Sequence, residues 1–290
     1  MNIFITGAQG FVGKNLCEQL KGRYNILAPS HSELELLNEH KVVEYLKKFK
    51  IDTVIHCANV GATRKTDNLP QIVGNNIRMF LNLAKHEQYF NRMIFFGSGA
   101  EFDKRQPLVK IGENYLANSL PESDYGFSKH LCSHFIKESK KIINLRIFGV
   151  YGRNDDYENR FVSNAVCRAV LGLPIVIFQD QTMSFIFVDD LVKVVEHFIV
   201  SAPKEKFYHT AASQSFRLEE IAQKIKAISG KDLQIIIKKP GLVNEYTCDN
   251  SKLIEELGDF QFTEMDESLR ILFEWYSERK NLIIPAKLLI

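Results

Sequence analysis

A glycine-rich turn after the first apolar segment constrains the fold of this chain more than any other feature. Residues Asn2–Thr6 are typical of a strand, Gly13–Leu20 are typical of a helix, and the turn between them reads GAQGFV. In such a junction Gly7 permits a tight turn, Gly10 lets a backbone approach a phosphate, and Gly13 lets the helix lie close to the sheet. The N–H groups at the helix start would then bind a dinucleotide pyrophosphate, whereas the same spacing outside a strand–helix context would indicate a plain turn.

Strand-like and helix-like segments alternate over the first half of the chain. This alternation predicts an α/β fold with a Rossmann-type, doubly wound parallel sheet and right-handed crossovers. The expected strands are Asn2–Thr6, Asn25–Pro29, Thr53–Cys57, Met93–Gly97 and Ile143–Ile147, and the expected helices are Gly13–Leu20, His40–Phe49, Pro70–His86 and Ser123–Lys140.

The alternation becomes less regular after Arg153, although no repeat, low-complexity segment or flexible linker interrupts the chain. We therefore expect a smaller α/β domain, formed by residues 153–183 and 214–290, that interleaves with a Rossmann-type domain formed by residues 1–152 and 184–213. A strand, a turn at Asp189 and Asp190, and a helix with these two acids at its N-terminal end are expected near residues 184–200. The apolar tail 281–290 is expected in the core or at a subunit contact. Further expected helices are Phe161–Leu171, Leu218–Ser229, Ser251–Leu257 and Met265–Arg279, with strands at 174–178, 207–211 and 233–239.

Composition excludes several classes of function. The net charge of +2 gives no support to a nucleic-acid or anionic-membrane partner. The five cysteines are scattered without a CxxC pair, which argues against a disulfide framework or a metal site and fits a reducing cytoplasm. No apolar run approaches the roughly 18 residues of a membrane helix, and the N-terminal residues lack the pattern of a signal peptide.

A tyrosine and a lysine form a candidate proton-transfer pair. Tyr125 and Lys129 are four residues apart in an expected helix and therefore share one face. The pKa of a free phenol is about 10, and a nearby ammonium lowers it toward the range of a general acid or base. Ser98 follows an expected strand, at the edge where parallel sheets bind ligands. The alternatives are an ordinary amphipathic helix and a turn serine.

The end of the second expected strand bears on the choice of cofactor. Enzymes that bind NAD usually carry an acidic residue there, which hydrogen-bonds the ribose. Here Pro29, Ser30 and His31 occupy the zone. A 2′-phosphate would meet no repulsion from these residues, so NADP(H) is favoured over NAD(H).

Six motifs together resemble one enzyme superfamily. TGAQGFVG, HCAN, GSGAEF, YGFSK, LRIFGVYG and FIFVDDL occur in the order typical of the extended short-chain dehydrogenase/reductases that process nucleotide sugars. The resemblance implies that Ser98, Tyr125 and Lys129 are catalytic. It also implies a set of cofactor contacts, namely Gly7, Gln9, Gly10, Phe11, Val12, Gly13, Ser30, His31, Ala58, Asn76, Tyr125 and Lys129, and a set of substrate contacts, namely Ser98, Gly99, Tyr125, Gly149, Arg160 and Arg168.

Within this superfamily the chain is most similar to GDP-fucose synthases, dTDP-4-dehydrorhamnose reductases and CDP-paratose or CDP-abequose synthases. The resemblance implies reduction of a nucleotide-linked 4-keto-6-deoxy sugar, with hydride delivered to C4 and a proton supplied by Tyr125. The positions used for epimerisation in GDP-fucose synthase hold Ala100 and Arg160, and Gly99 stands where dehydratases have an acid, so neither reaction is expected. Met183 and Gly149 replace an arginine and an asparagine that the family often has.

Two other functions stay open from the sequence. One is a 4-epimerase that keeps NAD tightly bound, and the other is a non-catalytic dinucleotide-binding regulator. The expected partner is a nucleotide-diphosphate sugar, without a metal, nucleic acid or membrane. The resemblance further implies a homodimer formed through the helices near 70–86 and 123–140.

Overall fold

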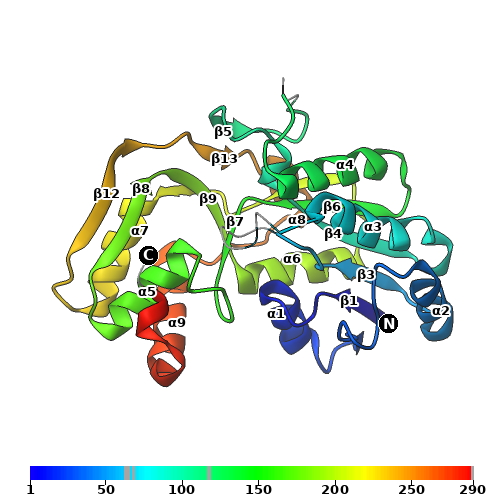
Figure 1. Ribbon diagram of the computed structural model, residues 1–290, viewed down its shortest axis with the longest axis horizontal. Coiled ribbons are helices and arrows are strands. Elements are labelled where there is room, and N and C mark those ends of the chain that lie inside the picture. Colours follow the sequence, from blue (N-terminus) through cyan, green and yellow to red (C-terminus); the bar gives the residue numbers. More distant parts are fainter. Residues whose placement is uncertain (62–65, 67–68, 116–118, 289–290) are drawn as a thin grey trace.

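A six-stranded parallel sheet forms the centre of the computed structural model, which describes residues 1–61, 66, 69–115 and 119–288 (Figure 1). The strand order is β10-β6-β4-β3-β1-β2, so the order reverses between β1 and β3. Every neighbouring pair is parallel. The strands are β1 (Asn2–Thr6), β2 (Asn25–Leu27), β3 (Thr53–His56), β4 (Arg92–Ser98), β6 (Ile142–Ile147) and β10 (Phe207–Thr210).

Helices cover both faces of this sheet because successive strand side chains point to opposite sides. Ile3 and Ile5 of β1 pack in a core with α1 and α6, whereas Phe4 packs in a second core with α2, α3 and α4. Figure 1 shows α3 and α4 on one side of the sheet and α1 and α6 on the other. The doubly wound fold is thus confirmed. The helices are α1 (Phe11–Leu20), α2 (Glu39–Phe49), α3 (Ile72–Ala84), α4 (Asp124–Glu138) and α6 (Val188–Val200).

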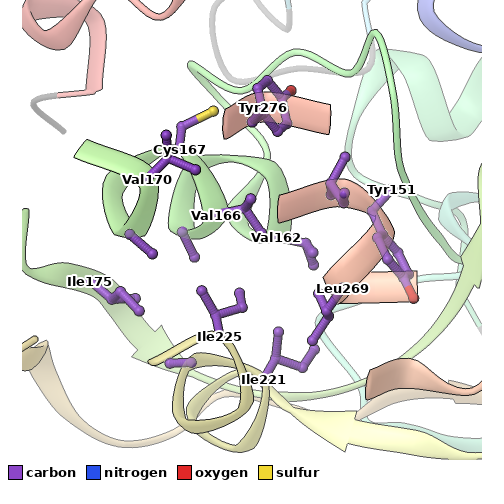
Figure 2. Packing of buried hydrophobic residues seen from close by; sticks show 14 of the residues in the cluster. Tyr151, Val162, Val166, Cys167, Val170, Ile175, Ile221, Ile225, Leu269 and Tyr276 are labelled. Carbon is purple, nitrogen blue, oxygen red and sulfur yellow. The ribbon is translucent and has the colours of Figure 1, made fainter. Parts of the chain in front are cut away.

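The remaining elements build a second region with its own core. Three helices surround this core, to which α5 contributes Val166, α7 contributes Ile221 and α9 contributes Leu269 (Figure 2). A second sheet has the order β11-β9-β13-β5, with β7 paired to β9, and β12 pairs with β8. The strands are β5 (Leu108–Ile111), β7 (Gly149–Tyr151), β8 (Ile175–Asp180), β9 (Thr182–Phe187), β11 (Ser215–Arg217), β12 (Ile235–Leu242) and β13 (Tyr246–Cys248); the helices are α5 (Phe161–Leu171), α7 (Leu218–Ser229), α8 (Ser251–Leu257) and α9 (Met265–Glu278).

The structure differs from the sequence-based elements in a few places. Asp189 and Asp190 lie at the N-terminal end of α6 as expected, where the helix dipole favours their charges, although the helix follows β9 directly without a separate turn. The short strands β5, β7, β11 and β13 were not predicted. None of them belongs to the strand–helix alternation that indicated β2 and β3, which are equally short. Ile283 and Leu288 of the apolar tail are buried in the second core. The expected domain boundary at residue 184 falls within β9, and the division into domains stays a prediction.

Among the described residues, none of the helices has both the length and the apolar character needed to cross a lipid bilayer.

Candidate active site

A cleft of about 1090 Å³ opens at the carboxyl ends of the central strands. Gly7 follows β1, Ala58 follows β3, and Ser98 ends β4, and all three line the cleft. Met183 of β9 and Tyr246 of β13, from the second sheet, also line the cleft. The cleft therefore lies where open parallel sheets bind ligands, beside the reversal of strand order.

The glycine turn has the geometry that a bound pyrophosphate needs. Gly7 has φ +65°, and a Cβ at this position would lie 2.7 Å from the Ala58 backbone nitrogen. Gly10 N donates to the Gly7 carbonyl at 3.0 Å and closes the turn. A Cβ on Gly13 would overlap that same carbonyl oxygen and would lie 2.8 Å from the Ala8 Cα. All three glycines line the cleft at the start of α1, so its backbone amides fit a dinucleotide phosphate.

The other predicted cofactor contacts divide into two groups. One group lines the cleft, and it consists of Gln9, Phe11, Val12, Ser30, His31 and Ala58. Asn76 does not line the cleft. Its side chain accepts from Val60 N at 2.7 Å and donates to Val60 O at 2.9 Å, so it fixes the loop that follows β3.

A carboxylate does reach the end of β2, contrary to the sequence-based expectation. The chain turns back after Ser30, and both Ser30 N and Ser30 Oγ donate to Glu33 Oε2 at 2.7 Å. The backbone hydrogen bond from Ser30 lowers the pKa of the Glu33 carboxyl. His31 Nε2 lies 2.8 Å from Glu35 Oε2. Two glutamate side chains therefore contact the residues expected to meet a 2′-phosphate, and Glu35 itself lines the cleft.

Ser98 and Tyr125 approach the same cleft from different elements. Ser98 ends β4, and Tyr125 lies in the first turn of α4, which Ser123 caps by accepting from Gly126 N at 3.1 Å. Lys129 lies one turn further along α4 and is buried behind Tyr125. Its Nζ donates to the Phe96 carbonyl at 2.7 Å and lies 5.6 Å from the centroid of the Tyr125 ring. The ammonium is thus close enough to act on the phenol electrostatically.

A buried carboxylate that sequence reasoning did not assign to the site connects these elements. Glu101 Oε1 accepts from Ser98 N at 3.2 Å and from Asn144 Nδ2 at 3.0 Å. Its Oε2 accepts from Ser133 Oγ at 2.5 Å and from Arg146 Nε at 2.7 Å. The network joins the end of β4 to β6 and α4. One sequence pattern could have indicated this network. Asn144 and Arg146 are two residues apart, and therefore on one face, in an otherwise apolar strand.

Tyr246 is a second residue that the sequence analysis missed. It is buried, lines the cleft, and its hydroxyl lies against Gly99, the residue after Ser98. Its ring centroid lies 4.9 Å from that of Phe148. Burial raises the pKa of Tyr246. No sequence signal indicated it, because β13 has only three residues and is far from Ser98 in the chain.

Two glycines predicted as substrate contacts lie behind the cleft wall. A Cβ on Gly99 would overlap the Tyr246 hydroxyl, and a Cβ on Gly149 would lie 2.7 Å from the Phe185 ring. Neither glycine lines the cleft. Both leave room for neighbouring side chains, so we do not retain them as substrate contacts.

The two predicted arginines also have different surroundings. Arg160 lines the cleft, and its Nε lies 3.3 Å from Asp155 Oδ1. Burial raises the pKa of Asp155 to about 6. Arg168 is buried away from the cleft, where it donates to Asn164 Oδ1 and to the Leu288 carbonyl. Its hydrogen bonds hold the chain end against α5, so its prediction as a substrate contact is not retained.

The rest of the cleft lining combines apolar and charged residues. The apolar residues include Ala100, Phe148 and Met183, and the charged residues include Asp103, Lys104, Arg105 and Asp156.

Comparison with known proteins gives consistent matches. A family model described as the NAD dependent epimerase/dehydratase family matches residues 3–209. GDP-L-colitose synthase of Yersinia pseudotuberculosis is 22% identical over 307 residues, which cover 97% of this chain and 99% of that protein. The structure resembles GDP-mannoheptose C4 reductase of Campylobacter jejuni with NADP bound, with TM-score 0.79, 19% identity, and 95% and 98% of the two chains covered. It also resembles UDP-glucose 4-epimerase of Thermotoga maritima with UDP-glucose, with TM-score 0.82, 22% identity, and 98% and 100% covered.

Proposed function

The chain belongs to the NAD dependent epimerase/dehydratase family, and from this premise we propose that it reduces the 4-keto group of a nucleotide-linked 6-deoxy sugar. The observation that supports this most is that the glycine turn, Ser98 and Tyr125 line one cleft, with Lys129 directly behind the phenol. An NAD(P)H-dependent enzyme needs this combination of a phosphate site and a proton donor.

Each residue has a distinct task in the reduction. When bound, NADPH supplies the hydride that reaches C4 of the sugar. Tyr125 donates its phenolic proton to the carbonyl oxygen, so that the carbonyl becomes an alcohol. Ser98 donates a hydrogen bond to the same oxygen as negative charge develops on it. The Lys129 ammonium stabilises the phenolate that remains until a proton from solvent restores it.

The cleft wall supports a 6-deoxy sugar and a reaction confined to C4. Ala100 lies next to Ser98 in the chain and has no proton to exchange, so epimerisation at C3 and C5 is not part of the proposal. Phe148 and Met183 provide the apolar surface for the sugar methyl group. Arg160, which lines the cleft together with Arg105, is the arginine that would meet the diphosphate of the nucleotide.

NADP(H) is the cofactor that we propose. Ser30 and His31 line the cleft at the end of β2. The Glu33 carboxylate, which accepts from Ser30 N and Ser30 Oγ, does not itself line the cleft and is therefore not placed against a 2′-phosphate. The relative affinity for NADPH and NADH, measured by the thermal stabilisation that each one produces, tests this choice.

The activity is tested by mixing the purified protein with NADPH and 4-keto-6-deoxy sugars linked to GDP, CDP, dTDP or UDP. We expect loss of NADPH absorbance with one of them, and a decrease in kcat of about 10²- to 10⁴-fold for Tyr125→Phe. Tyr89→Phe, a half-buried tyrosine outside the cleft, is the control and should retain wild-type kcat. Absence of NADPH consumption across the whole series would overturn the proposal.

Two outcomes would identify the alternative functions. A protein that keeps NAD through purification and interconverts C4 epimers without net cofactor consumption is a 4-epimerase. A Tyr125→Phe protein that retains full biological activity points to a non-catalytic regulator.

We also propose that the protein forms a homodimer through α3 and α4. Leu131 and Phe135 on α4 are each 36% exposed, which is consistent with an apolar contact surface. Light scattering of wild-type and Phe135→Glu proteins tests this, and a monomeric wild type would contradict it.

A further inference from the structure

Ser98 and Tyr125 belong to different elements, although the proposed reaction needs both side chains at one carbonyl oxygen. Ser98 ends β4, and Tyr125 lies in the first turn of α4. A displacement of about 1 Å between reacting groups can cost about 100-fold in rate, so the distance between these two elements matters for the reduction. The contacts that fix this distance lie behind the cleft, in the network around Glu101.

Ser98 also caps the short 3₁₀ helix η2 (Gly99–Glu101) that follows β4. Ala100 N donates to Ser98 Oγ at 3.1 Å, and Ser98 N donates to Glu101 Oε1 at 3.2 Å. These reciprocal hydrogen bonds form a capping box. The box fixes the backbone and the side chain of Ser98, and it leaves the hydroxyl hydrogen available for a substrate oxygen.

Glu101 is in turn held by α4, the helix that carries Tyr125. Ser133 Oγ of α4 donates to Glu101 Oε2 at 2.5 Å, and His130 Nδ1 lies 3.1 Å from the Glu101 carbonyl oxygen. Both the side chain and the main chain of Glu101 therefore contact this helix. Ser133 lies about two helical turns after Tyr125, so one rigid element presents the phenol and holds Glu101.

Two donors hold Glu101 from the central sheet. Asn144 Nδ2 donates to Oε1 at 3.0 Å and Arg146 Nε donates to Oε2 at 2.7 Å, both from β6. Each carboxylate oxygen of Glu101 thus accepts two hydrogen bonds, and the side chain is 2% exposed. Gly97 leaves space for the network, because a Cβ there would overlap Glu101 Oε1 and Asn144 Oδ1. The carboxylate is therefore confined to one position.

We propose that Glu101 is a positioning residue that sets the Ser98 hydroxyl at the distance from the Tyr125 phenol that the reduction requires. Its carboxylate connects the backbone of Ser98 to α4 through Ser133. The buried network thereby places both hydrogen-bond donors before the substrate binds. This inference rests on the proposed function, in which both donors contact the carbonyl oxygen of the sugar.

Ser133→Ala tests the inference because it removes the bond between Glu101 and α4 and leaves the rest of the network. We expect kcat to fall about fivefold, the effect of one lost hydrogen bond in the transition state, with unchanged KM for the sugar nucleotide. NADPH binding, measured by thermal shift, should not change. Ser139→Ala is the matched control, since Ser139 Oγ donates to Glu87 Oε2 at 2.7 Å away from the cleft, and it should retain wild-type kcat.

Glu101→Gln is a stronger perturbation of the same network. The glutamine places an NH2 group where a carboxylate oxygen accepted two donors, so one side of the network is broken. We expect kcat to fall about 10- to 100-fold. Each variant is assayed at a temperature at which its unfolding curve shows the native state, so unfolded protein does not contribute to the loss.

A Ser98→Ala background separates positioning from a merely structural role. In that background Ser133→Ala should lower kcat no further, because the hydroxyl through which Glu101 acts is absent. A further fivefold loss in that background would show that the network acts independently of Ser98 and would overturn the inference.

The outcomes also distinguish this inference from the proposed function. A wild-type reductase that is impaired by Ser98→Ala, but keeps full kcat with both Ser133→Ala and Glu101→Gln, overturns the role of Glu101 alone. A wild-type protein that reduces none of the sugar nucleotides, or a Ser98→Ala variant with full activity, overturns the proposed function and this inference with it.

Discussion

Replacing Gly13 by alanine tests whether the helix–turn contact, rather than glycine flexibility, maintains the phosphate site. Gly13 lies in the first turn of α1 and is buried. The added Cβ would overlap the Gly7 carbonyl oxygen and would lie 2.8 Å from the Ala8 Cα. Both contacts are backbone atoms of the glycine turn, so no flexible side chain can move aside. Helix α1 must instead shift away from the turn.

Two opposing effects determine how much Gly13→Ala changes the free energy of unfolding. Alanine is favoured over glycine in a helix by about 1 kcal/mol. Overpacking a rigid, buried contact costs about 1–3 kcal/mol, and an overlap with backbone corresponds to the upper part of that range. The expected net loss for Gly13→Ala is therefore about 1–2 kcal/mol. Gly74→Ala is the matched control, because Gly74 lies in α3 with no heavy atom within 4 Å of the added Cβ, and it should gain about 0.5–1 kcal/mol.

Urea unfolding, analysed by linear extrapolation, measures both changes. A thermal-shift titration with NADPH then reports on the phosphate site, since a ligand at 100 times its Kd stabilises the native state by about 2.7 kcal/mol. We expect Gly74→Ala to keep this stabilisation and Gly13→Ala to lose most of it. A Gly13→Ala protein as stable as Gly74→Ala, with the full NADPH-dependent shift, would refute the reasoning.

Three further predictions concern buried charges. Burial raises the pKa of the Asp155 carboxyl from its ordinary 3.8 to about 6. Between these two pH values the folded state holds a proton that the unfolded state has lost. The resulting stability is fully present below the unfolded pKa, and about 3 kcal/mol of it is lost as pH rises through 6. The free energy of unfolding, measured with urea across this pH range, should fall with rising pH in wild type and not in Asp155→Asn. The same pH dependence in both proteins would contradict the prediction. Glu101→Gln leaves the Arg146 charge buried without its partner and should lower the free energy of unfolding by about 3 kcal/mol; a value within about 0.5 kcal/mol of wild type would show that the pair is dispensable. Arg168→Met should destabilise the protein, because the hydrogen bond to the Leu288 carbonyl is lost, without changing KM for the sugar nucleotide. A raised KM with unchanged stability would restore the interpretation of Arg168 as a substrate contact.

The sequence alone predicted those features that depend on residues close together in the chain. The junction of β1, the glycine turn and α1 is one continuous segment, so spacing and residue type determine its geometry. Tyr125 and Lys129 share a helix face for the same reason, because a separation of four residues is about one turn. The doubly wound sheet followed from repeated strand–helix units, each of which is local.

Only the tertiary structure determined which distant segments meet at the cleft. Tyr246 reaches Gly99, at the end of β4, because β13 pairs with β5 and β9 in the second sheet. Glu101 meets Arg146 because β4 and β6 are neighbours in the first sheet. Arg168, in contrast, faces the second core and the chain end instead of the cleft. These contacts depend on how whole sheets and helices pack, and no periodicity within a single segment contains that information.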